Sequence, residues 1–592
     1  MTRLTAKISG ILLALSVAAC GSGSSSTSQQ GGAGASTPGS GGNTVGNTNL
    51  GSGGSPAGGN GSSLGNSGGS AVGAGGSAAG NTGGMTIGAG GSIAAATGGT
   101  KASTTATGGT NASATGGTSA NITGGTTAIA SGGGSSAATG GQAAVGGTTS
   151  SGASSGAQLI TSALNDYFNT TKQATVVATG TATLTVDAST TYQRWDGFGG
   201  CFNEMGWDAL SVVSSAEQAN ALKLLFDAKD GANFTYGRLP MGASDYSMSW
   251  YTLDDTAGDY AMSNFSIARD LQKLIPFIKA ALQVKSDVRL WASPWVVPSW
   301  MMDSSSNMKS DAQTLGAHAL YMAKFVEEYA KQGLKIEAIH PQNEPGYARV
   351  HWTQALLIDF IKTYLGPTFA QRNLTTEIWC GTMSKSPADG NIAIAAAADS
   401  AAMKYIKGFG LQWNLKGIVG NLSPKGAVMQ TEHRCGNYNF DADYWDKTRY
   451  DANKPQNDHA YGEESWQLIR DWVTAGVNSY AAWNMVLDTV GKSLDAWPQN
   501  SLLVVDRTTK KVIQTPAYYV FRQFSQFILP GATRIAITGS NDALAFKNAD
   551  GSIIAEIYNK ATTAQTHTVK VGSAFYQCSV PSHGWATLRV VP

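Results

Sequence analysis

Residues 191–530 alternate short apolar segments with longer amphipathic ones, and no other feature limits the possible fold as much. The apolar segments are typical of buried strands, as in VRLWASPW at 288–295. The longer segments have helical periodicity, as in DAQTLGAHALYMAKFVEEYAKQG at 311–333. Strands that alternate with helices of this length indicate a parallel sheet with helices packed outside it. About eight such units in about 340 residues predict an α/β chain folded as a (β/α)8 TIM barrel.

An open, doubly wound sheet is the alternative fold for the same alternation. Such a sheet usually carries a GxGxxG or phosphate-binding turn after a strand, and the sequence has neither. We therefore predict the barrel. Within it, we expect strands at 375–382 and 426–432 and a helix through 402–409 between them.

The helical pattern stops near residue 530, and a different domain is expected beyond it. Residues 531–592 alternate apolar and polar side chains between turns, which predicts a small antiparallel β-sandwich at the side of the barrel. The β-branched segment 174–190 has no place in the barrel. We expect it to supply N-terminal strands to that sandwich.

Residues 21–158 have a composition that cannot build a core. They are almost entirely Gly, Ser, Ala, Thr and Asn, and Lys101 is the only charged residue among them. So little apolar surface cannot offset the entropy lost on ordering a chain. We predict a long disordered linker.

Residues 1–20 have the layout of an export signal. Arg3 and Lys7 precede the apolar run ISGILLALSVAA, which is too short to span a bilayer. The small residues before Cys20 are similar to the lipobox of bacterial lipoproteins, in which the cysteine is lipidated. The alternative is an ordinary signal peptide with an incidental cysteine. Because the linker would serve as a tether, we predict an exported lipoprotein, anchored in a membrane and facing the cell surface or the periplasm, or else secreted.

Charge and cysteine usage exclude several classes of protein. The formal net charge is +1, so nothing indicates nucleic-acid binding. Four cysteines, Cys201, Cys380, Cys435 and Cys578, form neither a CxxC pair nor a zinc-binding spacing. Their pairing is open, because disulfides and buried thiols are both compatible with the sequence.

Two predicted strands are followed closely by a glutamate. IHPQNEPGY places Glu344 after the fourth barrel strand, and VMQTEHRCG places Glu432 after the seventh. In a (β/α)8 barrel the strand ends surround one mouth, so these side chains are expected to face each other. Retaining glycoside hydrolysis needs such a pair, with one carboxyl protonated as the acid and the other ionised as the nucleophile.

Other strand ends supply groups that suit a sugar. Arg238 follows the second strand and would hold Glu432 ionised, unless it pairs with Asp245 instead. Asn343 can hydrogen-bond a sugar 2-hydroxyl. Trp295 and Trp483 offer apolar faces for a pyranose ring. Each of these residues alone is more often structural, but together they favour a carbohydrate site.

Several motifs occur in an order that resembles a known family. WDGFGGCFNE, GRLPMGASDYS, WASPWVVPSWM, HPQNEPG, VMQTEHRCG and AAWNMVLD are similar to the glucosylceramidase-like glycoside hydrolases, family 30 of clan A. The similarity covers about residues 185–592. It implies a (β/α)8 barrel with a side β-sandwich fed by both termini, and a retaining β-glycosidase. It implies Glu344 as acid/base and Glu432 as nucleophile. The sugar-binding residues would be Arg238, Asp245, Trp295, Asn343, Trp413, Trp483 and Asn500.

The sequence departs from the family after the sixth strand. Members often carry His-Trp or His-Tyr there, and this chain has Gln412-Trp413. The stretch from HRCGNY to about residue 458 also looks specific to a subfamily. The sugar, the linkage and the choice between exo and endo action are therefore open.

The prediction for function is a monomeric glycosidase that needs no metal or cofactor. The resemblance favours β-linked glucosides, cleaved by an endo-β-1,6-glucanase or a glucosylceramidase-like enzyme. The alternatives are a member that cleaves xylan or β-xylosides, and a non-catalytic glycan-binding surface protein. The expected partners are a carbohydrate substrate and, through the lipid at Cys20, a membrane. A non-catalytic protein would not need both glutamates.

Overall fold

A computed structural model describes residues 156–346, 349–434, 458–496 and 498–592. The predicted signal segment with Cys20, nearly all of the predicted linker, and Cys435 with the segment after it lie outside the described residues. No helix within the described ranges is both long and apolar enough to cross a membrane.

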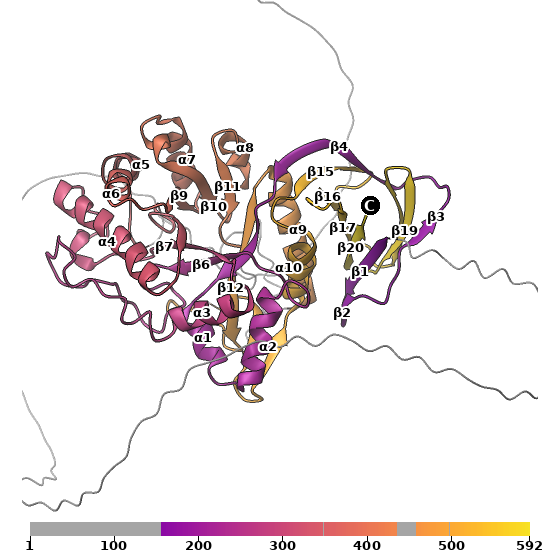
Figure 1. Cartoon of the computed structure of the whole chain (residues 1–592), viewed down its shortest axis with the longest axis horizontal. Helices are drawn as coiled ribbons and strands as arrows, with labels where there is room; N and C mark the ends of the chain where they lie inside the picture. Colours follow the sequence, from indigo (N-terminus) through magenta and orange to yellow (C-terminus); the bar gives the residue numbers. More distant parts are fainter. Residues whose placement is uncertain (1–155, 347–348, 435–457, 497) are drawn as a thin grey trace, which may run out of the picture. The chain divides into compact units, whose positions relative to one another are not determined.

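Eight parallel strands close into the predicted barrel (Figure 1). The eighth strand pairs with both the seventh and the first, so the sheet has no gap. The carboxyl ends of all eight strands therefore meet at one mouth. The strands are β5 (Gly197–Cys201), β6 (Tyr236–Pro240), β7 (Arg289–Ser293), β8 (Ile336–Ile339), β9 (Glu377–Met383), β10 (Ile406–Leu411), β11 (Ala427–Gln430) and β12 (Ser479–Asp488).

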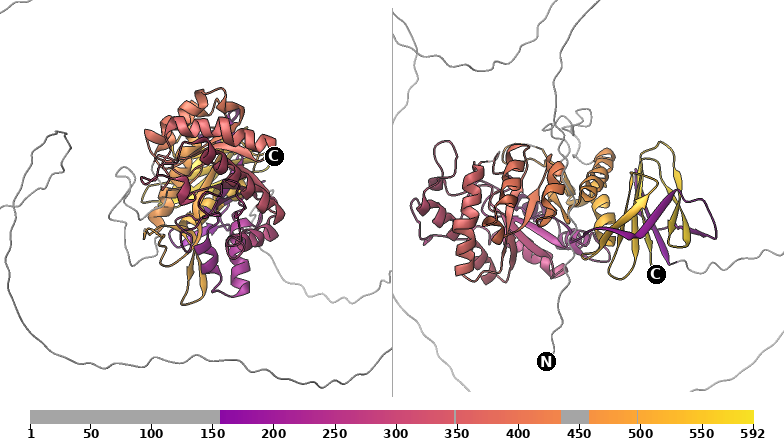
Figure 2. Two further views of the ribbon diagram at one scale, coloured as in Figure 1. Left: turned by 90° about the vertical axis from the view of Figure 1, so that its left-hand side faces the viewer. Right: turned by 90° about the horizontal axis from the view of Figure 1, so that it is seen from above.

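Helices surround these strands (Figures 1 and 2). Six of them begin where a side-chain oxygen accepts the backbone N–H three residues on, which is the usual cap of a helix N-terminus. Asp311 caps the longest helix in this way and ends the loop before it. The helices are α1 (Glu204–Leu210), α2 (Ser215–Phe226), α3 (Leu274–Val284), α4 (Ala312–Lys331), α5 (Gln354–Asp359), α6 (Gly366–Gln371), α7 (Ala388–Ala398), α8 (Val419–Leu422), α9 (His459–Ala475) and α10 (Pro516–Phe527).

The predicted helix through 402–409 is wrong. Residues 402–404 form a single 3-10 turn, and strand β10 begins at Ile406. The strand contains Gly408 and Gly410, which weaken the strand pattern in the sequence. Both glycines are required by close packing. A Cβ at Gly408 would lie 2.7 Å from the Trp379 ring, and one at Gly410 would lie 2.5 Å from the Gly381 oxygen. The helix of this unit is α7, earlier in the chain.

Ten strands form the second sheet, in the order β2-β1-β20-β17-β16-β15-β4-β18-β19-β3. Both ends of the described chain contribute to it, and its strands enclose a separate apolar core. The N-terminal strands are β1 (Ala157–Ala163), β2 (Asp166–Asn169), β3 (Thr175–Val177) and β4 (Leu184–Arg194). The C-terminal strands are β15 (Thr533–Thr538), β16 (Ala543–Lys547), β17 (Ile553–Asn559), β18 (Gln565–Val571), β19 (Ala574–Val580) and β20 (Gly584–Val590).

The N-terminal contribution to this sheet is larger than the sequence pattern indicated. The expected segment, 174–190, corresponds to β3 and β4, and β4 runs on to residue 194. Strands β1 and β2 were not anticipated. Strand β1 starts at Ala157, inside the predicted linker, because the apolar residues of 157–163 pair with β20. Two further strands, β13 (Ser501–Asp506) and β14 (Lys511–Gln514), extend the barrel sheet beyond β12.

The barrel and the sandwich meet at α9 and α10 (Figure 1). Trp466 of α9 stacks on Tyr558 of β17, with ring centroids 5.2 Å apart. Gln523 of α10 donates to Thr587 Oγ1 of β20 over 3.1 Å and accepts from Ser162 of β1. One apolar cluster runs through both domains at this joint. The sandwich is therefore packed against the barrel helices and not merely linked to them.

A buried carboxyl at this joint gives a stability prediction. Glu556 of β17 is fully buried, and Thr587 donates to its two oxygens over 3.0 and 2.9 Å. Burial raises the pKa of Glu556 well above its usual value, with the Thr587 hydrogen bond opposing. A carboxyl whose pKa is raised by folding stabilises the fold at low pH, and this contribution is lost as pH rises above the unfolded pKa.

We expect Glu556→Gln to be more stable than the wild type at pH 8, by about 1–3 kcal/mol. The gain should shrink toward pH 5, because the free-energy cost of protonating the carboxyl on folding falls as pH approaches its unfolded pKa. Urea unfolding at both pH values measures this. A variant that is less stable at pH 8 by the same amount as at pH 5 would contradict the burial of a neutral acid.

Candidate active site

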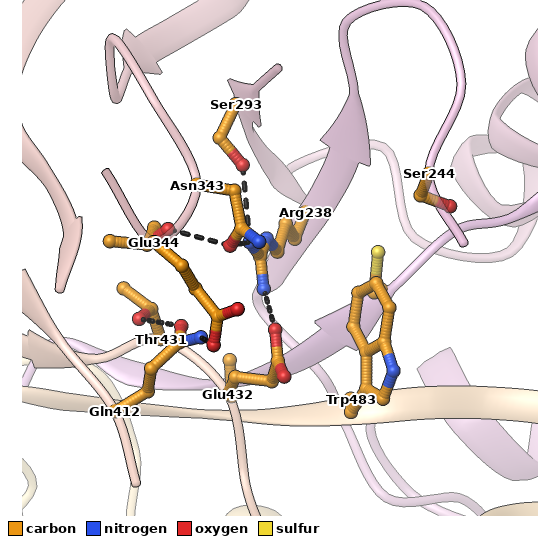
Figure 3. A network of polar contacts seen from close by, with 12 residues as sticks. Arg238, Ser244, Ser293, Asn343, Glu344, Gln412, Thr431, Glu432 and Trp483 are labelled. Atoms are coloured by element: carbon orange, nitrogen blue, oxygen red, sulfur yellow. Dashed lines mark hydrogen bonds and ion pairs between the residues drawn. The ribbon is translucent and has the colours of Figure 1, made fainter. Parts of the chain in front are cut away.

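Glu344 lies in the loop after β8, in a backbone conformation that is unusual for its residue type. Its φ is +49°, in the left-handed region that non-glycine residues rarely occupy. The surrounding chain holds it there, since its N–H donates to the Thr382 oxygen over 2.8 Å and Asn343 N–H donates to the Pro294 oxygen over 2.9 Å. Such strain persists at functional sites when neighbours fix it. The carboxyl points toward Glu432 (Figure 3).

Glu432 follows β11 and is held between the neighbouring strands. Thr431 N–H donates to the Leu411 oxygen over 2.9 Å, and His433 N–H donates to the Ala481 oxygen over 2.7 Å. These bonds continue the sheet past the end of β11, so the Glu432 backbone cannot shift. Its side chain is 7% exposed.

Arg238 of β6 connects the two halves of the site (Figure 3). It is fully buried, and its Nη1 donates to Glu432 Oε2 over 2.6 Å. Its Nη2 donates to Asn343 Oδ1 over 2.6 Å and to Ser293 Oγ over 3.2 Å. Arg238 thus pairs with Glu432, and the described residues include no ion pair between Arg238 and Asp245.

Two tryptophans form one wall of the site. The rings of Trp295 and Trp483 stack with centroids 5.3 Å apart. The Arg238 guanidinium lies 4.2 Å from the centre of the Trp295 ring. The Trp483 indole donates to Gln499 over 2.8 Å, which fixes its orientation. Both rings are mostly covered, so a sugar would contact their free edges and not a full face.

Asp245 brings a carboxyl to the mouth from the loop after β6. Its backbone oxygen accepts from Leu494 N–H over 2.7 Å. Its Oδ1 is buried and has no hydrogen-bond partner among the described residues. Burial raises the pKa of Asp245 to about 8, and the charge of Glu432 adds to the rise. A buried oxygen of this kind suits a hydroxyl ligand, because it costs free energy when left unpaired.

The remaining predicted sugar-binding residues lie at different depths. Trp413 follows Gln412 at a φ of +52°, and hydrogen bonding from Trp413 is among the contacts that lower the pKa of Glu432. Asn500, just before β13, lines a small cavity together with Trp483, Asn484 and His433. Asn500 therefore lies near Trp483, while Trp413 lies beside the nucleophile candidate.

Four uncharged polar residues, Ser293, Thr382, Gln412 and Thr431, hold the site residues in place and were not predicted as site residues from the sequence. Ser293 Oγ accepts from Arg238, and Thr382 Oγ1 donates to Asn343 Oδ1. Thr431 Oγ1 donates to Gln412 Oε1. Gln412 itself donates to Glu344 over 3.0 Å. The sequence marked Gln412 only as a departure from a family pattern. The other three carry no signal beyond their positions near strand ends.

Two histidines beside the site do not compete with the glutamates for protons. His433 lies between the Tyr480 hydroxyl at 2.6 Å and the Ser465 hydroxyl at 3.1 Å, and His340 contacts the Gly381 oxygen at 2.8 Å. Burial lowers the pKa of each to about 3. Both rings are therefore neutral at pH 7.

The two glutamates differ in electrostatic environment. Burial raises the pKa of Glu344 to about 8, the charge of Glu432 adds to the rise, and the Gln412 hydrogen bond opposes it. Burial also raises the pKa of Glu432, but the charge and hydrogen bond of Arg238 work against it. The first proton bound by the pair therefore goes to Glu344. This leaves one neutral acid beside one carboxylate, as retaining glycosidases require.

Among the described residues, neither the cysteines nor the acidic side chains form a disulfide or a metal site. Cys201, Cys380 and Cys578 are buried free thiols. Across the four described ranges, no group of three His, Cys, Asp or Glu side chains is placed to hold a metal ion.

Family models match both domains. The glycosyl hydrolase family 30 TIM-barrel domain matches residues 195–528, and the family 30 β-sandwich domain matches residues 531–588. The chain therefore belongs to glycoside hydrolase family 30, and it is a retaining β-glycosidase.

Individual relatives are more distant. The lysosomal acid glucosylceramidase of Mus musculus is 26% identical over 421 residues, covering 65% of this chain and 78% of that enzyme. An endo-1,6-β-D-glucanase of Trichoderma harzianum is 26% identical over 380 residues, covering 60% of this chain and 74% of that enzyme. The crystal structure of SrfJ from Salmonella typhimurium superposes with a TM-score of 0.66 at 22% identity, over 74% of this chain and 99% of SrfJ.

The raised pKa of Glu344 predicts an alkaline limit to activity. If Glu344 acts as the acid, kcat/KM falls as pH rises through about 8, because the acid loses its proton there. Initial rates on a β-glycoside between pH 5 and 10 measure this. Asp245 has a pKa in the same range, so Asp245→Asn is the control. The alkaline limb should persist in that variant; its disappearance would assign the limb to Asp245.

Proposed function

We propose that the enzyme hydrolyses β-linked glucosides, with Glu432 as the nucleophile and Glu344 as the acid/base. The observation that carries this proposal is the asymmetric pairing of Arg238. It binds Glu432 directly and does not contact Glu344, so one carboxyl is held ionised and the other is left to take up a proton.

In the first step, a Glu432 oxygen bonds to the anomeric carbon. The bond from that carbon to the glycosidic oxygen breaks, and the Glu344 proton moves to the leaving oxygen. Arg238 keeps the attacking carboxylate in place. The products of this step are the released alcohol and a glycosyl ester on Glu432.

In the second step, water attacks the same carbon and Glu344 takes the proton from that water. The ester bond to Glu432 breaks, and its carboxylate returns. While Glu432 is esterified it has no charge, so one cause of the raised pKa of Glu344 is removed. Glu344 is thereby suited to be a base in this step after being an acid in the first.

The surrounding groups are suited to hold the sugar. The Oδ1 of Asn343 accepts from Arg238 and from Thr382, over 2.6 and 2.8 Å. Its NH2 group is therefore the end that can donate to a sugar 2-hydroxyl. Asp245 can accept from another hydroxyl, and the Trp295–Trp483 edge covers the C–H side of the ring.

The glucoside preference rests on two relatives of this chain. Those relatives are named a glucosylceramidase and an endo-1,6-β-glucanase, so glucose is the expected sugar at the cleaved bond. We also propose that the enzyme is an exported lipoprotein anchored through Cys20, since Cys20 and the linker after it have the pattern of a lipidated tether. We infer a monomer, because one chain supplies every group described above.

A substrate panel tests this proposal. Full-length protein in detergent should cleave p-nitrophenyl β-glucoside and either a β-1,6-glucan or glucosylceramide, and leave xylan and p-nitrophenyl β-xyloside largely intact. Oligosaccharide products would mean endo action, and glucose alone would mean exo action. Cleavage of xylan in preference to every glucoside would overturn the glucoside assignment.

A further inference from the structure

The Gln412 side chain lies between the segments that carry the two glutamates, after β8 and after β11 (Figure 3). It is fully buried at the end of β10. Its Nε2 donates to Glu344 Oε1 over 3.0 Å, and its Oε1 accepts from Thr431 Oγ1 over 2.9 Å. Thr431 directly precedes Glu432. The amide therefore links the proposed acid/base to the strand that carries the proposed nucleophile.

The Gln412 backbone is held independently of its side chain. Its N–H donates to the Met383 oxygen over 2.8 Å, and its oxygen accepts from Leu415 N–H over 3.2 Å. The amide group is therefore not needed to place β10. The amide donates to the Glu344 carboxyl, which must exist in two protonation states during the reaction, and Gln412 hydrogen bonding also lowers the pKa of Glu432.

An amide offers both a donor and an acceptor at nearly the same position. With its NH2 toward Glu344 it stabilises the carboxylate. Turned over, its oxygen accepts from the protonated acid. Thr431 can match either orientation, because its hydroxyl also lies 3.3 Å from the Leu411 oxygen and can donate there while accepting from the amide.

We propose that Gln412 is a positioning residue for proton transfer by Glu344, with an amide that pairs with both the acid and its carboxylate. This inference rests on the proposed function of the two glutamates. The amide does not titrate, so the protonation of Glu344 is set by burial, by the charges of Glu432 and Asp389, and by hydrogen bonding.

The test compares two leaving groups. Phenyl β-glucoside needs a proton from the acid to depart, and 2,4-dinitrophenyl β-glucoside does not. For Gln412→Leu, which keeps the volume and removes the hydrogen bonds, kcat/KM on the phenyl substrate should fall roughly 10–100-fold. On the dinitrophenyl substrate, kcat/KM should stay within about threefold of the wild type, because no proton transfer is needed in that step.

Gln412→His is the second variant and guards against misfolding of the first. Its ring can donate to Glu344, so activity on the phenyl substrate should be largely retained. The buried histidines beside the site, His340 and His433, are neutral at pH 7, so a ring at position 412 should also be neutral and the alkaline limb should stay near pH 8. A loss on the phenyl substrate as large as that of Gln412→Leu would contradict the inference.

The outcomes separate this inference from the proposed function. Equal losses on the two substrates in Gln412→Leu would show a merely structural role, and no loss on either would show no role. Both results would overturn the inference while leaving a working glucosidase. A wild-type protein that cleaves neither glucoside would instead overturn the proposed function.

Discussion

Glu432→Gln will lose nearly all β-glucosidase activity, with kcat/KM falling about 10⁴-fold or more. The glutamine amide cannot form the glycosyl ester, so the two-step route is closed. The substitution keeps an oxygen that can accept from Arg238, whose side chain is fully buried and would otherwise lose its partner. The fold should therefore survive, and the loss should be chemical.

A matched control for this variant lies on the same barrel. Glu337 of β8 pairs with Arg289 and Lys335, away from the mouth. Glu337→Gln removes the same charge and should change kcat/KM less than about threefold, since partly exposed ion pairs contribute little. Initial rates on p-nitrophenyl β-glucoside, with thermal unfolding of each variant, measure both effects. If Glu432→Gln kept a tenth of wild-type activity, the nucleophile would have to be another group.

Glu344→Gln will lose activity in a way that depends on the leaving group. On phenyl β-glucoside we expect a loss of about 10²–10⁴-fold, the usual contribution of a positioned acid. On 2,4-dinitrophenyl β-glucoside the first step needs no acid, so kcat/KM should stay near the wild-type value while kcat falls. The fall in kcat follows because the second step loses its base.

Two further observations check the role of Glu344. Azide is a nucleophile that needs no base, so it should restore kcat on the dinitrophenyl substrate and give β-glucosyl azide. The alkaline limb near pH 8 should also be absent from kcat/KM of Glu344→Gln, because the titrating carboxyl is gone. If the variant kept this limb, or if its kcat/KM fell equally on both substrates, the acid would have to be a different residue.

The sequence predicted the barrel because its signals are local. Caps such as Asp311 and long amphipathic helices mark several of the units, and the glutamates stand soon after apolar strands. Strand β10 was misassigned because its packing needs glycine at 408 and 410, and glycine gives no strand signal. Strand β1 was missed because its partner, β20, is more than four hundred residues away in the chain.

The site was predicted only in part, for a similar reason. Arg238, Asn343 and both glutamates come from residue types that suit the chemistry. The hydrogen bonds and ion pairs among these residues depend on distances across the barrel. The sequence therefore left open whether Arg238 pairs with Asp245 or with Glu432. The supporting roles of Ser293, Thr382 and Thr431 depend entirely on that three-dimensional arrangement, since such residues are common after strands.

The most direct test of the catalytic pair is to trap the intermediate. A 2-deoxy-2-fluoro-β-glucosyl fluoride should inactivate the enzyme by forming a slowly hydrolysed ester, because fluorine destabilises the transition states of both steps while the good leaving group allows the first. Peptide mass spectrometry of the inactivated protein should place the fluoroglucosyl group on Glu432. A label on any other residue, or turnover of substrate with inversion and no label, would contradict the assignment of Glu432 as the nucleophile.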